Sequence, residues 1–243
     1  MTTLTQTAGR IMVALDYPGA DEARVLLKQL SGIPCYVKVG MQLFYAAGPD
    51  FVRELKQEGY KVFLDVKMHD IPNTVKGGAN SVTKLGVDMF NVHCSGGTAM
   101  MTAAMDGVHE ALDAGTGWNR PVVIGVTQLT STGAEMMNDE IGVPGTVEAS
   151  VVRYARLALD AGLNGVVASP LEVSQIKAAC GKAFQTVTPG IRPKGSAVGD
   201  QSRVLSPKEA FAHGTDYIVI GRPITAAPHP REALESILEE LIS

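Results

Sequence analysis

The sequence predicts an α/β protein, a single-domain (β/α)8 TIM barrel with parallel strands. Its 243 residues are close to the ~250 that are typical of this fold. Short apolar runs alternate with amphipathic helical stretches, a pattern that indicates βαβ units and a parallel sheet. Eight such runs in a chain of this length favour a closed barrel over an open doubly wound sheet.

The predicted strands are short, and several are rich in Val and Ile with little strict alternation of apolar and polar residues. Parallel strands that are covered on both faces have this composition. One helix between them is predicted over 21–30, where Ala23 and Leu26 begin an apolar face, and another over 149–161. In chain order, the strands are predicted at 11–15, 36–40, 61–67, 89–93, 122–129, 165–169, 185–191 and 217–222.

A single domain is predicted over residues 1–243, with the polar segment 1–9 as a flexible N-terminal tail. The Pro- and Gly-rich stretch 192–202 follows the seventh predicted strand, so we interpret it as a loop of the barrel rather than a linker. No GxGxxG sequence follows the first strand, and no Walker A sequence is present. These absences disfavour the common nucleotide-binding folds.

The composition argues against several kinds of partner. The formal net charge is -4 and there is no basic stripe or tail, so we expect no nucleic acid. No apolar run approaches the ~18 residues that span a bilayer, and the first residues lack the apolar core of a secretory signal, so we expect no membrane. Cys35, Cys94 and Cys180 are far apart and form no CxxC pair, which predicts reduced thiols in a cytoplasmic protein.

Charged residues stand at the C-terminal ends of the predicted strands, the edge at which (β/α)8 barrels carry their catalytic groups. Asp16 closes the first strand, Lys38 lies in the second, and Asp65 and Lys67 end the third. An ionised side chain in a strand that is buried on both faces loses hydration and needs a partner of opposite charge. We therefore expect these residues to pair with one another.

The spacing of these charges predicts an ion-pair array. Asp65 and Lys67 are two residues apart, so on a strand they share one face, and Asp70 begins the loop that follows. With Lys38 on the neighbouring strand, an alternating array of Lys38, Asp65, Lys67 and Asp70 becomes possible, and this alternation lets all four remain ionised. A purely structural ion-pair network is the alternative, but the position of these residues at strand ends, together with Asp16, favours a catalytic site.

A phosphate site is predicted at the end of the eighth strand. Barrels of this type often bind phosphate with the loops after strands seven and eight. Arg222 follows Ile220 and Gly221 and offers a planar guanidinium that suits phosphate oxygens. A solvated surface arginine is the alternative, which the position at the strand end disfavours.

The run from Asp65 to Thr74, Asp-Val-Lys-Met-His-Asp-Ile-Pro-Asn-Thr, resembles the signature of the orotidine 5′-phosphate decarboxylase family. The resemblance extends over nearly the whole chain, because further blocks similar to those of the family occur in the same order. These blocks lie at 14–16, 37–40, 91–93, 126–130, 188–192, 199–201 and 220–222. The loop 135–145 carries no motif of this kind.

The resemblance implies decarboxylation of orotidine 5′-phosphate to uridine 5′-phosphate and CO2 in de novo pyrimidine biosynthesis. Asp16 and Lys38 would hold ribose hydroxyls, and Lys38 would also orient Asp65. Asp65 would lie against the substrate carboxylate, and Lys67 would deliver a proton to C6 of the pyrimidine. The same resemblance implies a homodimer in which Asp70 and Thr74 reach into the neighbouring subunit's site.

The resemblance also implies how the rest of the substrate is held. Thr130 would bind the pyrimidine, and Gln201 would bridge from the loop 192–202 to the phosphate. Arg222 would bind the phosphate together with the backbone N–H groups of Gly221 and Arg222. Other substrate-binding residues implied by the family pattern are Ile71, Pro189 and Arg192.

We expect neither a metal nor an organic cofactor. Loss of CO2 from C6 leaves a carbanion with no adjacent electron sink, and the ammonium group of Lys67 can stabilise that charge and then protonate it. His69 and His93 lie near strand ends and are potential metal ligands, but Lys38 and Lys67 would place ammonium groups in the middle of such a site.

Two alternatives stay open at this point. A related phosphosugar barrel, a 3-keto-gulonate 6-phosphate decarboxylase or a ribulose-phosphate epimerase, would be expected to bind a metal and to carry an acidic or His ligand on the second strand. This chain has Lys38 there. A barrel that only binds a phosphorylated metabolite is the non-enzymatic alternative, and it would retain the nucleotide without releasing CO2.

Overall fold

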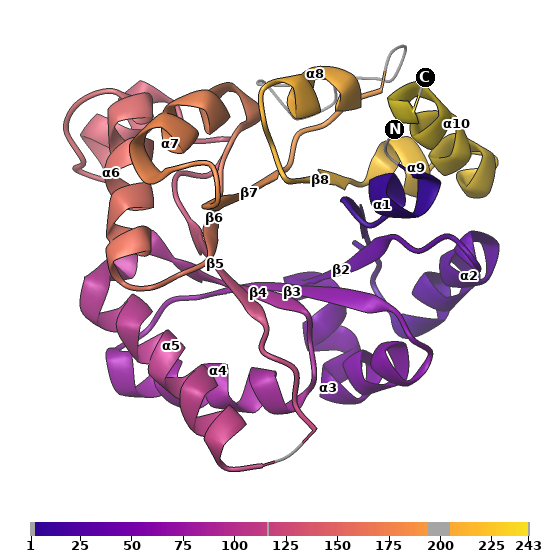
Figure 1. Ribbon diagram of the computed structural model, residues 1–243, viewed down its shortest axis with the longest axis horizontal. Coiled ribbons are helices and arrows are strands. Elements are labelled where there is room, and N and C mark those ends of the chain that lie inside the picture. The colour runs from indigo at the N-terminus through magenta and orange to yellow at the C-terminus, as the bar shows by residue number, and fades with distance from the viewer. Residues whose placement is uncertain (1–2, 116, 194–204, 243) are drawn as a thin grey trace.

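Eight parallel strands form a closed barrel in the order β1 to β8, and β8 pairs with β1 (Figure 1). The structure, a computed structural model, describes residues 3–115, 117–193 and 205–242. The strands are β1 (Ile11–Ala14), β2 (Tyr36–Gly40), β3 (Lys61–Met68), β4 (Met89–His93), β5 (Val122–Val126), β6 (Gly165–Val167), β7 (Gln185–Thr188) and β8 (Tyr217–Ile220). The predicted (β/α)8 barrel is confirmed, with one strand inside or nearly inside each predicted run.

Helices surround the barrel as an outer ring (Figure 1). The predicted helices over 21–30 and 149–161 are confirmed as α2 and α6, each with slightly different bounds. The α-helices are α1 (Leu4–Ala8), α2 (Ala20–Leu30), α3 (Met41–Gln57), α4 (Pro72–Lys84), α5 (Gly97–Asp113), α6 (Val147–Asp160), α7 (Val173–Cys180), α8 (Pro207–Ala212), α9 (Arg222–Thr225) and α10 (Pro230–Ile242). Short helical turns are η1 (Cys94–Gly96), η2 (Met136–Glu140) and η3 (Pro170–Glu172).

Two apolar cores stabilise the barrel. Along β1, Ile11 and Val13 belong to the larger core between strands and helices, whereas Met12 and Ala14 belong to a smaller core inside the barrel. Successive residues of a strand face opposite sides, so one strand contributes to both cores. The inner core is Met12, Ala14, Tyr36, Phe63, Met89, Ile124, Val187 and Val219. It fills the barrel interior beneath the C-terminal ends of the strands.

The N-terminal residues differ from the predicted flexible tail. Leu4–Ala8 form helix α1, in which the Thr3 side chain accepts a hydrogen bond from the Gln6 N–H and the Gln6 side chain accepts one from the Thr3 N–H. This reciprocal capping box stabilises the first turn of a helix. Thr7 and Ala8 are buried, and α1 lies beside α10 near the other end of the chain (Figure 1).

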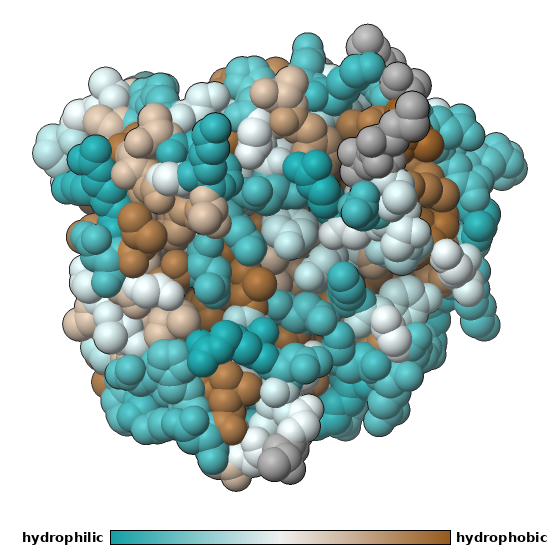
Figure 2. All heavy atoms as spheres, in the orientation of Figure 1, coloured by the Kyte–Doolittle hydropathy of each residue, from teal (hydrophilic) through white to brown (hydrophobic). Residues whose placement is uncertain are grey.

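On the face drawn in Figure 2, hydrophilic side chains predominate and apolar side chains show in smaller groups between them. In the described part of the chain, no helix is both long and apolar enough to cross a bilayer.

Candidate active site

A cavity of about 600 Å³ lies at the C-terminal ends of the strands. Its size is within the range of small-molecule sites, and it occupies the end of the barrel at which catalytic groups are expected. The structure brings together nine of the predicted site residues in its wall: Asp16, Lys38, Asp65, Lys67, Thr130, Pro189, Arg192, Gly221 and Arg222.

Alternating charges form one side of the cavity. Lys38 Nζ lies 3.0 Å from Asp16 Oδ1 and 3.4 Å from Asp65 Oδ2. Lys67 Nζ lies 2.6 Å from the other oxygen of the same carboxylate, Asp65 Oδ1. The Asp65 side chain is only 14% exposed and that of Lys38 only 9%, so the pair that they form is shielded from water. Asp65 is therefore held between two ammonium groups.

Burial disfavours the ionised form of Asp65, but the charges of Lys38 and Lys67 outweigh it and lower the pKa of the carboxyl below its ordinary value. Hydrogen bonds from Lys67 and Asn91 act in the same direction. The carboxylate therefore stays ionised at neutral pH. It can then fix the Lys67 ammonium in the cavity wall.

Asp70 does not take the place in this array that the spacing predicted. Its Oδ1 accepts a hydrogen bond from the Ile71 N–H at 2.6 Å, and both residues are exposed. Thr74 is also exposed, in the first turn of α4. The cavity of the same chain is not lined by Asp70, Ile71 or Thr74. The array within the chain is instead Asp16, Lys38, Asp65 and Lys67, because the Asp70 carboxylate, in the loop after β3, binds the Ile71 N–H rather than Lys67.

Asn91 on β4, for which the sequence predicted no role, joins this array. Its Nδ2 donates to Asp65 Oδ1 at 2.7 Å, and its Oδ1 accepts from the Lys67 backbone N–H at 2.8 Å. The residue is fully buried. A polar residue inside the apolar run Met89–Val92 is a signal that could have identified it, because buried amides need partners.

Gly40 makes room for the charged pair beside it. A Cβ at this position would lie 3.1 Å from Asp16 Oδ1 and 3.1 Å from Lys38 Nζ. Any larger residue would therefore have to displace one partner of the pair.

The opposite side of the cavity can hold an anion. Arg192 follows β7, Arg222 follows β8, and both line the cavity together with Gly221. Ala14, Phe63, Val126, Val167 and Val219 contribute an apolar surface between the two sides. Gln128, which was not predicted, also lines the cavity and donates from Nε2 to Ser150 Oγ at 3.2 Å. The predicted Gln201 lies outside the described residues.

The histidines near the site lie close together. The ring centroids of His69 and His93 are 5.4 Å apart. Burial, the His69 ring and the Lys67 charge lower the pKa of His93, with Asp65 acting against them. Across the described ranges, no group of three or more His, Cys, Asp or Glu residues is placed to hold a metal ion.

A closed (β/α)8 barrel whose mouth combines a buried Asp-Lys array with two arginines defines a barrel enzyme that acts on a small anionic molecule. A comparison with protein families matches residues 9–237 to the orotidine 5′-phosphate decarboxylase / HUMPS family. The chain belongs to this family, and it is an enzyme of the carboxy-lyase class.

Similar proteins cover almost the full length of the chain. A protein of Bacillus cereus (strain G9842) named orotidine 5′-phosphate decarboxylase is 49% identical over 230 residues, which are 95% of this chain and 96% of the relative. A protein of Bacillus cytotoxicus with the same name has the same identity and coverage. The crystal structure of orotidine 5′-phosphate decarboxylase from Lactobacillus acidophilus is 40% identical, with a TM-score of 0.85 over 96% of this chain and 99% of that one.

Proposed function

We propose that this chain decarboxylates orotidine 5′-phosphate to uridine 5′-phosphate and CO2, as a step of de novo pyrimidine biosynthesis in the cytoplasm. The observation that carries the proposal is the Lys67 ammonium held 2.6 Å from Asp65 in the wall of a cavity whose other side carries Arg192 and Arg222. Membership of the family and the names of its relatives support the same substrate.

The two sides of the cavity have different roles in this reaction. Arg222, Arg192 and the Gly221 backbone bind the phosphate, which places the pyrimidine toward Lys67 and Thr130. Binding energy from the phosphate, far from the reacting carbon, then orients the base for the chemical step. The ribose joins the phosphate to the pyrimidine, and Asp16 and Lys38 bind its hydroxyls.

The chemical step uses the charge array. As the C6 carboxylate leaves as CO2, the electron pair of the broken bond stays on C6 in the plane of the ring. The Lys67 ammonium stabilises this charge and then transfers a proton to C6. Asp65 fixes the ammonium, and its own charge repels the substrate carboxylate in the ground state. No metal or organic cofactor has a part in these steps.

The active form in this proposal is a homodimer. Asp70, Ile71 and Thr74 lie outside the cavity of their own chain, and Ile71 is 67% exposed. Asp70 and Thr74 would then enter the site of the neighbouring subunit, where Asp70 extends the charge array beside Lys67. The exposed position of this loop supports the proposal, because a second subunit could cover it without unfolding the barrel.

The phosphosugar alternative is disfavoured by the second strand. Lys38 is buried there between two carboxylates, at the position where a metal-dependent barrel of that kind would carry a ligand. A cation bound among Asp16, Lys38 and Asp65 would be repelled by the ammonium.

The test is the ultraviolet absorbance change when purified protein meets orotidine 5′-phosphate after exhaustive dialysis against a chelator. We expect full conversion to uridine 5′-phosphate with release of CO2, and no further gain on adding Mg²⁺ or Zn²⁺. Activity that is lost on chelation and restored by a metal would favour the phosphosugar alternative. Stoichiometric retention of the nucleotide without CO2 release would favour a binding protein.

A further inference from the structure

Asn91 connects the two residues on which the proposed chemistry depends. It is fully buried in the middle of β4 and does not line the cavity. A backbone N–H can only donate a hydrogen bond, so the Lys67 N–H fixes the Asn91 amide with its oxygen toward Lys67. The amide nitrogen then faces Asp65 Oδ1, the oxygen that also binds Lys67 Nζ.

The backbone beside Asn91 is irregular. Leu64 pairs with Phe90 and Met68 pairs with Val92, so four steps along β3 correspond to two along β4. The extra length of β3 contains Asp65 and Lys67. Among the described residues Lys67 is the only non-glycine residue with a positive φ, at 50°. L-residues rarely adopt this left-handed conformation, and it persists where surrounding contacts impose it.

The only side chain of β4 that lies between these two register points is that of Asn91, and it binds the irregular segment at both ends. One hydrogen bond holds the Lys67 backbone in its left-handed conformation. The other sets the rotation of the Asp65 carboxylate and therefore the position of the Lys67 ammonium. A neutral amide does this without adding a charge to the array.

We infer that Asn91 is a positioning residue for decarboxylation, which holds the Lys67 ammonium and the Asp65 carboxylate at the reacting carbon without touching the substrate. The inference rests on the proposed function of Lys67 as proton donor. It predicts that changes at Asn91 lower kcat and leave nucleotide affinity nearly intact, because the phosphate side of the cavity lies on other strands.

The first variant is Asn91→Leu, which keeps the approximate shape and removes both hydrogen bonds. We expect kcat to fall about 100-fold, the loss that a small misplacement of a catalytic group produces. The dissociation constant of uridine 5′-phosphate should change less than about threefold. A crystal structure of the variant should show Lys67 outside the left-handed region or the Asp65 carboxylate rotated, and this readout does not depend on activity.

The second variant, Asn91→Asp, separates the two bonds. The introduced carboxylate still accepts from the Lys67 N–H, but it places an oxygen in front of Asp65 and repels it. A pair of adjacent carboxyls binds a proton more readily than a single carboxyl does, because the charge of one raises the pKa of the other. We therefore expect the kcat of Asn91→Asp to recover toward the wild-type value as the pH falls, because the shared proton restores a hydrogen bond to Asp65. Asn91→Leu should show no such recovery.

Thr186→Val is the matched control, because Thr186 is also a fully buried polar residue of a strand, with its hydroxyl bonded to Asp216 at the other end of the barrel. We expect reduced stability with unchanged kcat.

The inference fails if folded Asn91→Leu keeps kcat within about threefold of wild type, or if affinity and kcat fall together. If Asn91→Leu does not fold, a flat pH profile for Asn91→Asp overturns it. Wild-type protein that does not decarboxylate would refute the proposed function instead, and the crystal structure would still test the positioning.

Discussion

The Asp65 carboxylate has two ammonium groups and one amide as partners, and this environment lowers its pKa. A group whose pKa is lower in the folded protein stabilises the fold above its unfolded pKa, and that stabilisation is lost as the pH falls through the folded pKa. We expect Asp65→Asn to lower the free energy of unfolding at pH 7 by roughly 1 to 3 kcal/mol, because Lys38 and Lys67 then lack their shared anion. Urea unfolding should show this difference shrinking toward acidic pH. A difference that is independent of pH would contradict the lowered pKa.

Arg222 is the residue on which phosphate recognition is expected to depend most. Arg222→Ala should weaken binding of uridine 5′-phosphate by about 2 to 4 kcal/mol, if its guanidinium meets the phosphate in a desolvated pair. Uridine, which lacks the phosphate, should bind nearly as it does to wild type. Titration calorimetry with both ligands measures the difference. Arg53→Ala is the control, because Arg53 lies on α3 and pairs with Asp50 on the surface. Equal losses of affinity for both ligands would indicate that Arg222 stabilises the fold and does not bind the phosphate.

The charged side chains of the site could be predicted from the sequence, but their exact partners could not. The two-residue spacing of Asp65 and Lys67 correctly placed both on one face. The role of Asn91 depends on the register shift between β3 and β4, which arises from pairing between segments far apart in the chain. Asp70 was expected to join the array from the loop after the third strand, but a loop residue has no strand periodicity that fixes its direction, and its carboxylate binds the Ile71 N–H instead.

At the scale of elements, the apolar runs located the strands well at their N-terminal ends. Their C-terminal ends were predicted less accurately: a strand was predicted over 122–129, whereas β5 ends at Val126. Beyond Val126, Thr127 and Gln128 are buried without being part of a strand, and Leu129 is 44% exposed. Burial therefore continues past the end of the strand, and an apolar residue such as Leu129 does not mark its end. Helix α1 was missed because a short polar segment has no apolar periodicity, although Thr3 and Gln6 form a capping box.

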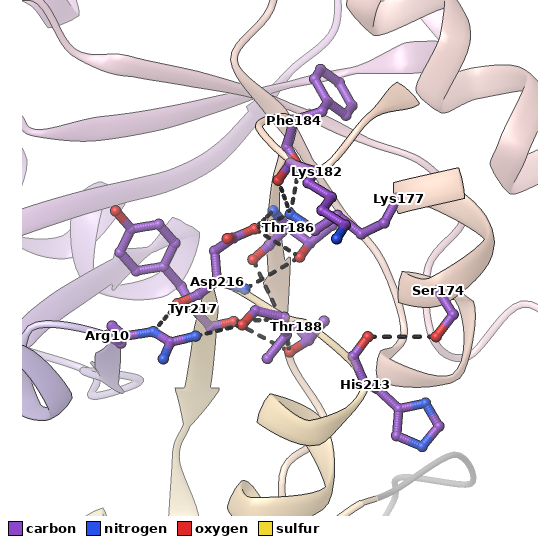
Figure 3. Close-up of polar contacts among 11 residues, drawn as sticks. Arg10, Ser174, Lys177, Lys182, Phe184, Thr186, Thr188, His213, Asp216 and Tyr217 are labelled. Carbon is purple, nitrogen blue, oxygen red and sulfur yellow. Dashed lines mark hydrogen bonds and ion pairs between the residues drawn. The ribbon is translucent and has the colours of Figure 1, made fainter. Parts of the chain in front are cut away.

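A recurring arrangement joins neighbouring strands at the N-terminal end of the barrel. Asp216, just before β8, accepts from the Thr186 N–H in β7 at 2.7 Å and from Lys177 Nζ at 2.6 Å (Figure 3). Asp88, just before β4, likewise accepts from the Val62 N–H in β3 at 2.7 Å and from Lys56 Nζ. Before β6, Asn164 accepts from the Val123 N–H in β5. Three pairs of strands therefore share one kind of side-chain bridge.

These bridges lie at the end of the barrel away from the cavity, so they should contribute to stability alone. We expect Asp216→Ala to lower the free energy of unfolding by roughly 1 to 3 kcal/mol, because the Thr186 N–H loses its partner in a buried setting. Asp216→Asn keeps an acceptor, as Asn164 does naturally, and should lose less. Urea unfolding and kcat are the two measurements. A large fall in kcat for folded Asp216→Ala would show that the two ends of the barrel are coupled.

At the scale of the whole molecule, the inner core fills the barrel below the cavity, and the cavity lies at the C-terminal end of the strands. The loop that begins at Asp70 is exposed at this same end and lies outside its own cavity. A two-fold dimer through this face would place each loop beside the partner's cavity, because an isologous interface repeats every contact. We propose that one site combines Lys67 of one subunit with Asp70 of the other.

The most direct test of this shared site is the activity of mixed Lys67→Ala and Asp70→Ala proteins, each of which we expect to be inactive alone. After subunit exchange, a hybrid dimer holds one intact site and one site that lacks both residues. Random pairing makes half of the dimers hybrids with one working site of two, so we expect activity to return to about a quarter of wild type. No regain of activity, with exchange verified by a mass-tagged subunit, would place Asp70 in the cavity of its own chain and contradict the shared site.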